Sequence, residues 1–274
     1  MPPSKKNPIG IIDIGSNSVR FVVYGPPYLG EYPLFNEKVQ CGLGRDLNST
    51  GRLSKNGMAC TLGALEGFRA IAKAMKVKTV HAIGTAALRD AKDGKSFAAK
   101  IRKTTGFPLQ VISGAEEARL AALGVLALIP DAGGVVGDLG GGSLELARIG
   151  GKRGTIAAPV SLPLGTLRIM TQKKKAAYIE AALADLPEDL LAQETFYAVG
   201  GTWRALAHAH AAQTKKRRRG DVYPVKAAAL ARPAICCSER SALKPSRMAC
   251  GVMDCSHRRL TGLPSGLPPP AYCS

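Results

Sequence analysis

Apolar residues recur along this chain in two patterns, one typical of strands and one typical of helices. The short runs rich in Ile and Val, which predict strands, lie at 9–15, 18–24, 36–42, 78–83, 108–112, 133–139, 143–149, 153–160 and 196–199. The stretches with an apolar position at every third or fourth residue, which predict helices, lie at 53–74, near 85–105, at 114–129, from 164 to about 186, and at 201–213. Strands that alternate with helices over 274 residues predict an α/β protein large enough for two domains.

One strand–turn–strand pattern occurs twice at a constant offset of 125 residues. Residues 9–24 and 134–149 each read as an apolar run, an Asp, a turn of small residues that ends in Ser, and a second apolar run. Asp13 therefore corresponds to Asp138, and Ser18 corresponds to Ser143. The repeat predicts two related domains that face one ligand.

The residues at both turns are suited to phosphate. A Gly without Cβ lets backbone N–H groups approach an anion closely, and Ser adds a hydroxyl donor. Asp13 and Asp138 cannot hold phosphate themselves, because like charges repel, so a carboxylate there is expected to hold Mg²⁺ or a water beside the phosphate. The chain after each turn returns as a strand, unlike the dinucleotide fingerprint, in which the turn opens into a helix.

Three further segments carry candidate chemistry. Arg89 lies one turn into a predicted helix that follows a strand and Gly-Thr, where a guanidinium can meet phosphate or simply face solvent. Glu116 and Glu117 lie in the first turn of the helix 114–129, where they suit the helix dipole; one of them can instead orient a water toward phosphorus. The strand 196–199 leads into a Gly-Gly-Thr turn and a helix. Such a helix N-terminus can bind an anion, but the motif taken alone is weak evidence for an anion site.

Five motifs, taken in order, resemble the exopolyphosphatase and guanosine pentaphosphate phosphohydrolase family. They read Asp-Ile-Gly-Ser-Asn-Ser, Gly-Thr-Ala-Ala-Leu-Arg, Ile-Ser-Gly-Ala-Glu-Glu-Ala-Arg-Leu, Asp-Leu-Gly-Gly-Gly-Ser-Leu-Glu-Leu and Val-Gly-Gly-Thr, within about residues 8–213. The resemblance implies two ribonuclease H-like domains of the actin-like ATPase superfamily, 1–125 and 126–213, with the active site in the cleft between them. It also implies hydrolysis of the terminal phosphoanhydride of inorganic polyphosphate or guanosine pentaphosphate, assisted by Mg²⁺ or another divalent cation.

The resemblance also implies roles for individual residues. Glu117 corresponds to the base that activates water, with Glu116 as its neighbour, and Asp138 and Glu145 correspond to the carboxylates that hold the cation. Arg89 corresponds to the family's phosphate-binding Arg. The loops that contact the substrate correspond to Asp13, Gly15, Ser16, Asn17 and Ser18, to Gly140, Gly141, Gly142 and Ser143, and to Gly200, Gly201 and Thr202.

The charge and hydropathy of the chain limit its partners. The net charge is +18, which fits a polyanionic substrate through electrostatic attraction, although many proteins of such charge have no charged partner. No apolar stretch approaches the roughly 18 residues of a membrane span, so we expect a cytoplasmic protein without a membrane partner. Nucleic acid is not the expected partner, and a homodimer stays open.

Residues 214–274 differ in kind from the rest. They carry a net charge of +9 in 61 residues, begin with the basic run 215–219, and hold five of the seven cysteines. They are expected to be disordered, and the second domain is expected to be incomplete at its C-terminal end. Zinc, disulfide and nucleic-acid interpretations of the tail are less favoured, because paired Cys-x-x-Cys knuckles, a secretory signal and interleaved aromatic residues are all missing from the sequence.

Two other functional classes stay open. An actin-like ATP-binding module or kinase predicts ADP formation with a second acceptor and function that survives replacement of Glu117. A non-catalytic remnant predicts that the chain binds polyphosphate without releasing phosphate.

We hypothesise that a frameshift replaced the native C-terminal part, because charge, cysteine use and motif content all change near residue 214. Such a product is expected to lower stability and activity. Resequencing the gene at this point tests the hypothesis: it predicts a recoverable alternative frame, and an intact frame with matching relatives over 214–274 contradicts it.

Overall fold

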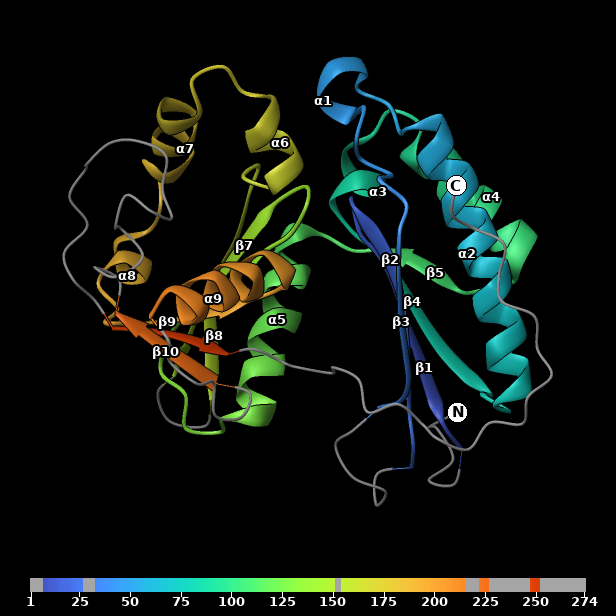
Figure 1. The fold of residues 1–274 in the computed structure, drawn as a ribbon, viewed down its shortest axis with the longest axis horizontal. Coiled ribbons are helices and arrows are strands. Elements are labelled where there is room, and N and C mark those ends of the chain that lie inside the picture. Colours follow the sequence, from blue (N-terminus) through green and yellow to red (C-terminus); the bar gives the residue numbers. More distant parts are fainter. Residues whose placement is uncertain (1–6, 27–32, 151–153, 215–221, 227–246, 252–274) are drawn as a thin grey trace.

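The computed structural model describes residues 7–26, 33–150, 154–214, 222–226 and 247–251, which form two α/β lobes side by side (Figure 1). The first lobe contains β1 (Ile9–Ile14), β2 (Ser18–Tyr24), β3 (Pro33–Gln40), α1 (Leu47–Thr50), α2 (Lys55–Ala74), β4 (Thr79–Gly84), α3 (Ala86–Asp90), α4 (Gly94–Thr105) and β5 (Leu109–Val111). The second contains α5 (Gly114–Leu128), β6 (Gly134–Leu139), β7 (Leu144–Gly150), β8 (Thr155–Leu162), α6 (Thr166–Thr171), α7 (Lys175–Leu183), α8 (Glu188–Leu191), β9 (Thr195–Val199), α9 (Gly201–Thr214), β10 (Val222–Lys226) and β11 (Arg247–Gly251).

The two sheets have the same strand order. The first sheet runs β3-β2-β1-β4-β5, and the second runs β8-β7-β6-β9-β11 with β10 added at its edge. In each sheet the first three strands in sequence pair antiparallel, and two later strands, β4 and β5 in the first sheet and β9 and β11 in the second, join in parallel. This is the duplicated ribonuclease H-like topology, so the expected fold class is confirmed.

The tail supplies strands that the sequence pattern did not predict. β11 pairs in parallel with β9, in the place that β5 takes in the first sheet, and β10 pairs antiparallel with β11. Within the tail these two segments therefore form strands, and β9 has a partner at the C-terminal end of the domain that was expected to be incomplete. The rest of 215–274 lies outside the described residues.

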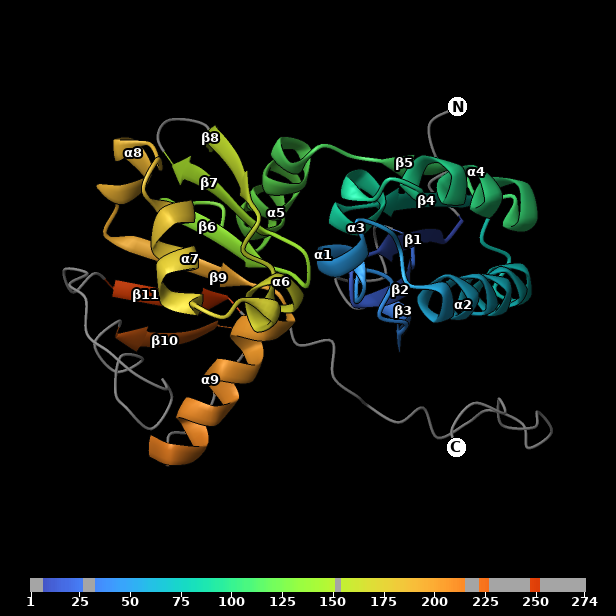
Figure 2. The same ribbon diagram turned by 90° about the horizontal axis from the view of Figure 1, so that it is seen from above.

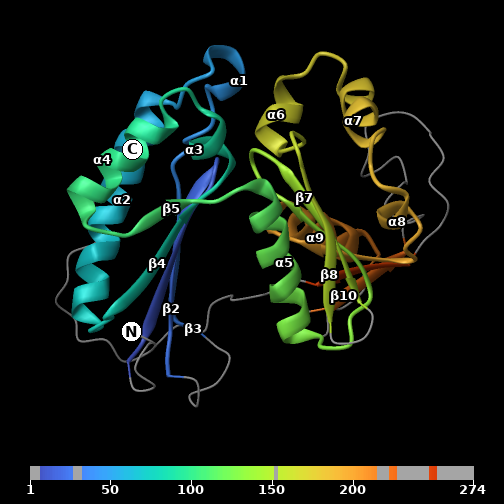
Figure 3. The ribbon, with the colours of Figure 1, turned by 180° about the vertical axis from the view of Figure 1, so that it is seen from behind.

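Helices α2 and α4 cover one face of the first sheet, and the core lies between these helices and the sheet (Figure 2). Phe21 of β2 packs on Phe68 of α2 with ring centroids 5.3 Å apart, and Leu65 and Ile101 are fully buried beside them. In the second lobe α5 covers one face of the sheet and α9 lies on the other, as Figure 3 shows from behind. The short helices α1 and α8 were not expected, because four residues are too few to show a helical period.

Strand alternation decides which residues face the cleft. Ile12 and Ile14 of β1 are buried in the core, so Ile11 and Asp13, which alternate with them, point to the other face of the sheet. Asp13 pairs in register with Arg20 of β2, which pairs in register with Lys38 of β3. One row of charged residues therefore crosses three strands on the side of the second lobe.

The lobes also touch at the top of the cleft, where α1 and α6 approach each other (Figure 1). The Asn48 side-chain amide donates to the Thr171 hydroxyl at 2.7 Å, and Arg168 of α6 forms an ion pair with Asp90 of α3. Among the described residues, no helix is long and apolar enough to cross a membrane.

The packing of α2 on the loop after β3 predicts opposite effects for two glycines of one helix. A Cβ on Gly57 would lie 2.7 Å from the Leu43 Cα and 2.9 Å from the Gly42 carbonyl oxygen, whereas a Cβ on Gly63 would meet nothing within 4 Å. Gly57→Ala is expected to lower the free energy of unfolding by about 1–3 kcal/mol through overpacking. Gly63→Ala, the matched control, is expected to raise it by up to about 1 kcal/mol through helix propensity. Urea denaturation measures both, and equal effects of the two substitutions would contradict this packing.

Candidate active site between the lobes

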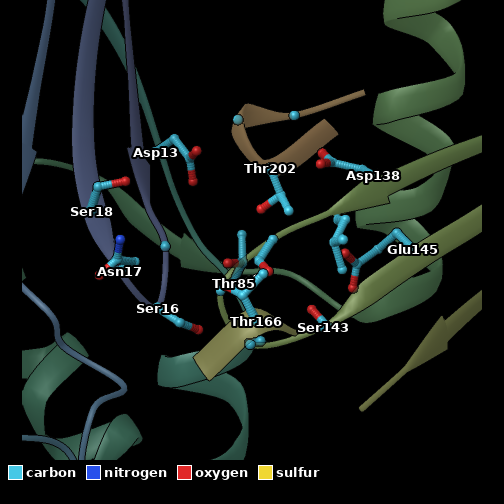
Figure 4. A pocket seen from close by; sticks show the side chains of 18 of the residues that line it. Asp13, Ser16, Asn17, Ser18, Thr85, Asp138, Ser143, Glu145, Thr166 and Thr202 are labelled. Atoms are coloured by element: carbon cyan, nitrogen blue, oxygen red, sulfur yellow. Dashed lines mark hydrogen bonds between the residues drawn. The ribbon is translucent and has the colours of Figure 1, made fainter. Parts of the chain in front are cut away.

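A cavity of about 620 Å³ lies between the two lobes and collects most of the residues that the sequence singled out (Figure 4). The lining residues that were expected at the site are Asp13, Gly15, Ser16, Asn17, Ser18, Glu117, Asp138, Gly140, Gly141, Gly142, Ser143, Glu145, Gly200, Gly201 and Thr202. The lining residues that were not expected there include Arg20, Lys38, Thr85, Thr166 and Arg204. Figure 4 shows Asp13 on one wall, facing Asp138 and Glu145 on the other.

The two small-residue turns have the same geometry. The Gly15 amide donates to the Ser18 carbonyl at 3.0 Å, and the Gly140 amide donates to the Ser143 carbonyl at 3.0 Å. Other loops hold two further carbonyls of each turn: amides of residues 41, 42 and 44 donate to the Ser16 and Asn17 carbonyls, and amides of residues 166 and 167 donate to the Gly140 and Gly141 carbonyls. With their carbonyl oxygens held in this way, the turns can present N–H groups and hydroxyls to an anion.

The turns also contact each other across the interface. A Cβ on Gly142 would lie 2.3 Å from the Ser16 Oγ, and a Cβ on Gly141 would lie 3.2 Å from the Asn17 Cβ. The second turn therefore needs residues without side chains to approach the first. The Ser16 hydroxyl is buried without a hydrogen-bond partner among the described residues, so it is available to a ligand.

Four carboxyl groups share the cavity, and the pKa of each is raised above its ordinary value. Burial and the neighbouring Glu145, Asp13 and Glu117 raise the pKa of Asp138 to about 8, and burial and Glu117 raise the pKa of Glu145 to about 7. Desolvation by the surrounding protein and the charge of Glu117 raise the pKa of Asp13 to about 6, although the positive charges of Arg20 and Lys38 oppose this shift. The site therefore concentrates negative charge that a bound cation would stabilise.

Asp138 and Glu145 form a pair of carboxylates at the cavity wall. They lie directly opposite each other on β6 and β7, a position in which like charges repel, and Glu145 is only 2 % exposed. Ser161 of β8 donates to the Glu145 Oε1 at 2.8 Å and orients it. Among the described residues, no three His, Cys, Asp or Glu side chains are grouped to hold a metal ion. Two carboxylates that share the cation with phosphate oxygens and waters are the usual arrangement for Mg²⁺, so the pair fits.

Gly200 lies directly beside the Asp138 carboxylate. Its φ of +103° is a conformation that side chains rarely adopt, and a Cβ there would lie 2.5 Å from the Asp138 Oδ1. The glycine lets the turn between β9 and α9 approach Asp138, so that Thr202 reaches the cavity (Figure 4).

The structure distinguishes between the two adjacent glutamates. Glu117 lines the cavity, and burial raises its pKa even though Arg89 and Thr85 hydrogen bond to it. Glu116 does not line the cavity. Its carboxylate binds the Arg119 guanidinium through two hydrogen bonds of 2.7 Å, and its amide donates to the Ser113 cap at 3.2 Å. Glu116 is therefore a residue of the helix N-terminus rather than of the cavity.

Arg89 lies behind the cavity and not in its lining. Its Nη1 donates to the Glu117 Oε2 at 3.0 Å and to the Ile112 carbonyl at 3.3 Å, and its Nε lies 3.4 Å from the Asp90 Oδ1. The role of Arg89 in phosphate binding stays a prediction, because Arg89 is not part of the cavity lining in this structure. Here Arg89 holds Glu117 in place, and Asp90 connects it to Arg168 of the second lobe.

Three cations line the cavity on the side of Asp13. Arg20 and Lys38 extend from β2 and β3, and Arg204 extends from α9 of the second lobe. Burial and the nearby charges of Arg204 and Arg20 lower the pKa of Lys38, so an anion in this region would relieve their mutual repulsion. The pairing of β1, β2 and β3 places Arg20 and Lys38 in register with Asp13, so a known strand pairing would have indicated both residues. No sequence pattern indicates Arg204.

Comparisons with known proteins identify the family. The sequence profile of the Ppx/GppA phosphatase family matches residues 28–213, so the chain belongs to this family. The matched range begins after the first turn and ends where the composition changes. Exopolyphosphatase 1 of Mycobacterium tuberculosis is 32% identical over 164 residues, which are 59% of this chain and 47% of that protein. Exopolyphosphatase 1 of Mycobacterium leprae is 32% identical over 165 residues, with 59% and 48% covered.

Solved structures agree on the fold. An exopolyphosphatase from Cytophaga hutchinsonii has a TM-score of 0.72 at 23% identity, over 82% of this chain and 77% of that chain. The Aquifex aeolicus member of the Ppx/GppA family has a TM-score of 0.64 at 25% identity, over 82% and 76%. The chain spans about half the length of the curated relatives that it matches.

The raised pKa values predict how stability depends on pH when divalent cations are absent. The unfolded chain releases its carboxyl protons near the ordinary values of 3.8 and 4.5, whereas the folded chain holds them up to about 8. The free energy of unfolding is therefore expected to fall as pH rises across this window.

Glu145→Gln tests this expectation, since it removes one charge and keeps an acceptor for Ser161. The variant is expected to match the wild type at pH 4 and to be more stable at pH 8 by on the order of 1 kcal/mol or more. Urea denaturation with a chelator measures this difference, and an equal destabilisation at both pH values would contradict it.

Proposed function

We propose that this chain hydrolyses the terminal phosphoanhydride bond of inorganic polyphosphate and releases orthophosphate. The observation that carries the proposal is the position of two phosphate-compatible turns at one cavity, with a carboxylate pair on one side and three cations on the other. The names of the similar mycobacterial proteins support polyphosphate as the substrate class. Guanosine pentaphosphate, which also ends in a phosphoanhydride, is the alternative substrate.

The turns would bind the terminal phosphate. Residues 15–18 and 140–143 line one region from both lobes, and the unpartnered Ser16 hydroxyl is among their donors. A terminal phosphate carries dense negative charge, so fixed donors lower the cost of bringing a nucleophile to it. Because each lobe supplies one turn, the site is complete only while the lobes stay together.

Glu117 is the proposed general base. It is the carboxylate that lines the cavity from the first turn of α5, and its raised pKa brings it closer to the neutral range in which a base can both accept and release a proton. Arg89 holds its Oε2 at 3.0 Å and thereby orients the carboxylate. A water between Glu117 and the terminal phosphate would lose its proton to Glu117 as it attacks phosphorus, and the bridging oxygen would leave with the shortened chain.

Asp138 and Glu145 are the proposed ligands of Mg²⁺ or another divalent cation. When bound, the cation supplies positive charge to the phosphate oxygens. Residues of the second lobe support both ligands. Ser161 donates a hydrogen bond that orients Glu145, and Gly200 leaves room beside Asp138.

The cations beyond Asp13 favour a long anion over a single phosphate. Arg20, Lys38 and Arg204 line the same cavity as the two turns, but they do not belong to either turn. The phosphates that follow the terminal one can neutralise them, so a chain substrate satisfies both parts of the cavity. This is the feature that favours polyphosphate over an isolated phosphomonoester.

Replacement of the proposed base is the sharpest test of this function. Glu117→Gln keeps the shape of the side chain and removes the proton acceptor, so phosphate release from polyphosphate is expected to fall by about 10²–10⁴-fold. Glu116→Gln is the matched control, because the Glu116 carboxylate binds Arg119 at the surface, and the variant is expected to stay within about twofold of the wild type.

Phosphate release with polyphosphate, guanosine pentaphosphate and ATP, each with Mg²⁺ and with a chelator, measures these effects. Activity that survives Glu117→Gln would overturn the role of Glu117. Transfer of phosphate to a second acceptor with formation of ADP would favour a kinase instead. Binding of polyphosphate without phosphate release by the wild type would identify a non-catalytic remnant.

A further inference from the structure

Two cysteines lie in contact beside the first phosphate turn. Cys41 directly follows β3, and Cys60 lies in α2. Their Sγ atoms are 2.7 Å apart, compared with about 2.05 Å in a disulfide bond, and the two residues are 19 positions apart in sequence. Both are free thiols in this structure. Only a small movement of the two side chains separates this pair from a covalent bond.

The segment that carries Cys41 supports the phosphate turn directly. The amides of Cys41 and Gly42 both donate to the Asn17 carbonyl, at 3.0 and 2.9 Å, and the Gly44 amide donates to the Ser16 carbonyl at 2.7 Å. The helix that carries Cys60 packs on the same segment through Gly57, one turn earlier, where no Cβ would fit. A bond between the two sulfurs would therefore join α2 to the loop that holds the first turn.

The two thiols differ in their environment. Cys41 is 7% exposed, and burial together with its contact to Cys60 raises the pKa of its thiol to about 12, so it is protonated at neutral pH. Cys60 is partly exposed on the surface of α2. A small oxidant therefore reaches Cys60 first, and Cys41, whose sulfur is in contact with Cys60, gives up its thiol proton as that sulfur attacks.

We infer that Cys41 and Cys60 form a reversible intramolecular disulfide under a two-electron oxidant such as a peroxide. Cys60 takes one oxygen from the peroxide and becomes a sulfenic acid, and one water is released. The Cys41 sulfur then attacks the Cys60 sulfur, the S–S bond forms, the S–O bond breaks, and the hydroxyl leaves with the Cys41 proton as a second water. Two electrons pass from the two sulfurs to the peroxide, and a dithiol reductant reverses the reaction by exchange.

This inference does not depend on the proposed hydrolase activity. Disulfides are rare in reducing compartments, where those that do occur are often transient. A bond at this position would close a short loop that is anchored on the core of the first lobe. It would brace the support of the phosphate turn under oxidising conditions without adding a group to the cavity.

Peptide mapping of the full chain tests the inference. Trypsin cleavage after Lys38, Arg45, Lys55 and Arg69 places Cys41 in peptide 39–45 and Cys60 in peptide 56–69. After limited hydrogen peroxide, alkylation of the remaining thiols and non-reducing digestion, these two peptides are expected as one linked species that dithiothreitol separates. Met58 lies in the second peptide, and its oxidation is recognised as a separate gain of one oxygen.

Cys60→Ser is the matched variant, because the replaced side chain lies on the partly exposed face of α2. It is expected to abolish the linked species and to leave 39–45 as the alkylated thiol. The wild-type chain is expected to gain roughly 5 °C or more in its thermal unfolding midpoint on oxidation, and the variant is not. Recovery of both peptides as alkylated thiols, or their linkage to the five cysteines beyond residue 230 instead of to each other, would overturn the inference.

Discussion

The contact between the two glycine turns is the constraint on which the site depends. Each lobe has its own core and its own copy of the strand–turn–strand unit, but the cavity exists only where Gly141 and Gly142 approach Ser16 and Asn17. A side chain at Gly142 would collide with the Ser16 hydroxyl and separate the turns. The absence of side chains therefore fixes the distance between two sets of phosphate donors.

The duplicated unit has become chemically unequal on its two sides. The position opposite the turn Asp is Arg20 in the first copy and Glu145 in the second, at the same register. The first copy, extended by Lys38, makes the cavity wall cationic, and the second makes it anionic. A phosphate chain with a divalent cation satisfies both walls, because each wall then meets its opposite charge. An uncharged ligand would leave the pKa shifts of both walls unrelieved.

The sequence predicted the duplicated topology and most of the cavity, because those features depend on local patterns. The constant offset between Asp13 and Asp138 indicates two equivalent turns. The second turn joins β6 and β7 into a hairpin that places Asp138 opposite Glu145. Lys38 and Arg204 were missed, because their place at the cavity follows from strand pairing and from the docking of α9, which no local motif records. Helical spacing separates Glu116 from Glu117 by about 100° but does not say which of them faces the cleft.

The contacts of Arg89 with Glu117 and Asp90 and the strands of the tail were not predicted, for a related reason. A guanidinium that follows a strand can reach a ligand or a neighbouring carboxylate, and the partner is decided by α5 from outside its own segment. β11 completes the second sheet from residues whose composition carries no strand pattern. The family match ends at residue 213, before β10 and β11 begin. The frameshift hypothesis is the explanation offered for the origin of the residues that follow.

We propose that the two turns bind one terminal phosphate between them. A crystal structure of the Glu117→Gln variant soaked with tripolyphosphate and Mg²⁺ tests this binding most directly. We expect a terminal phosphate in contact with residues 15–18 and 140–143 at once, with the next phosphates toward Arg20 and Lys38. A phosphate held by only one turn, or a chain bound outside the cavity, would contradict it.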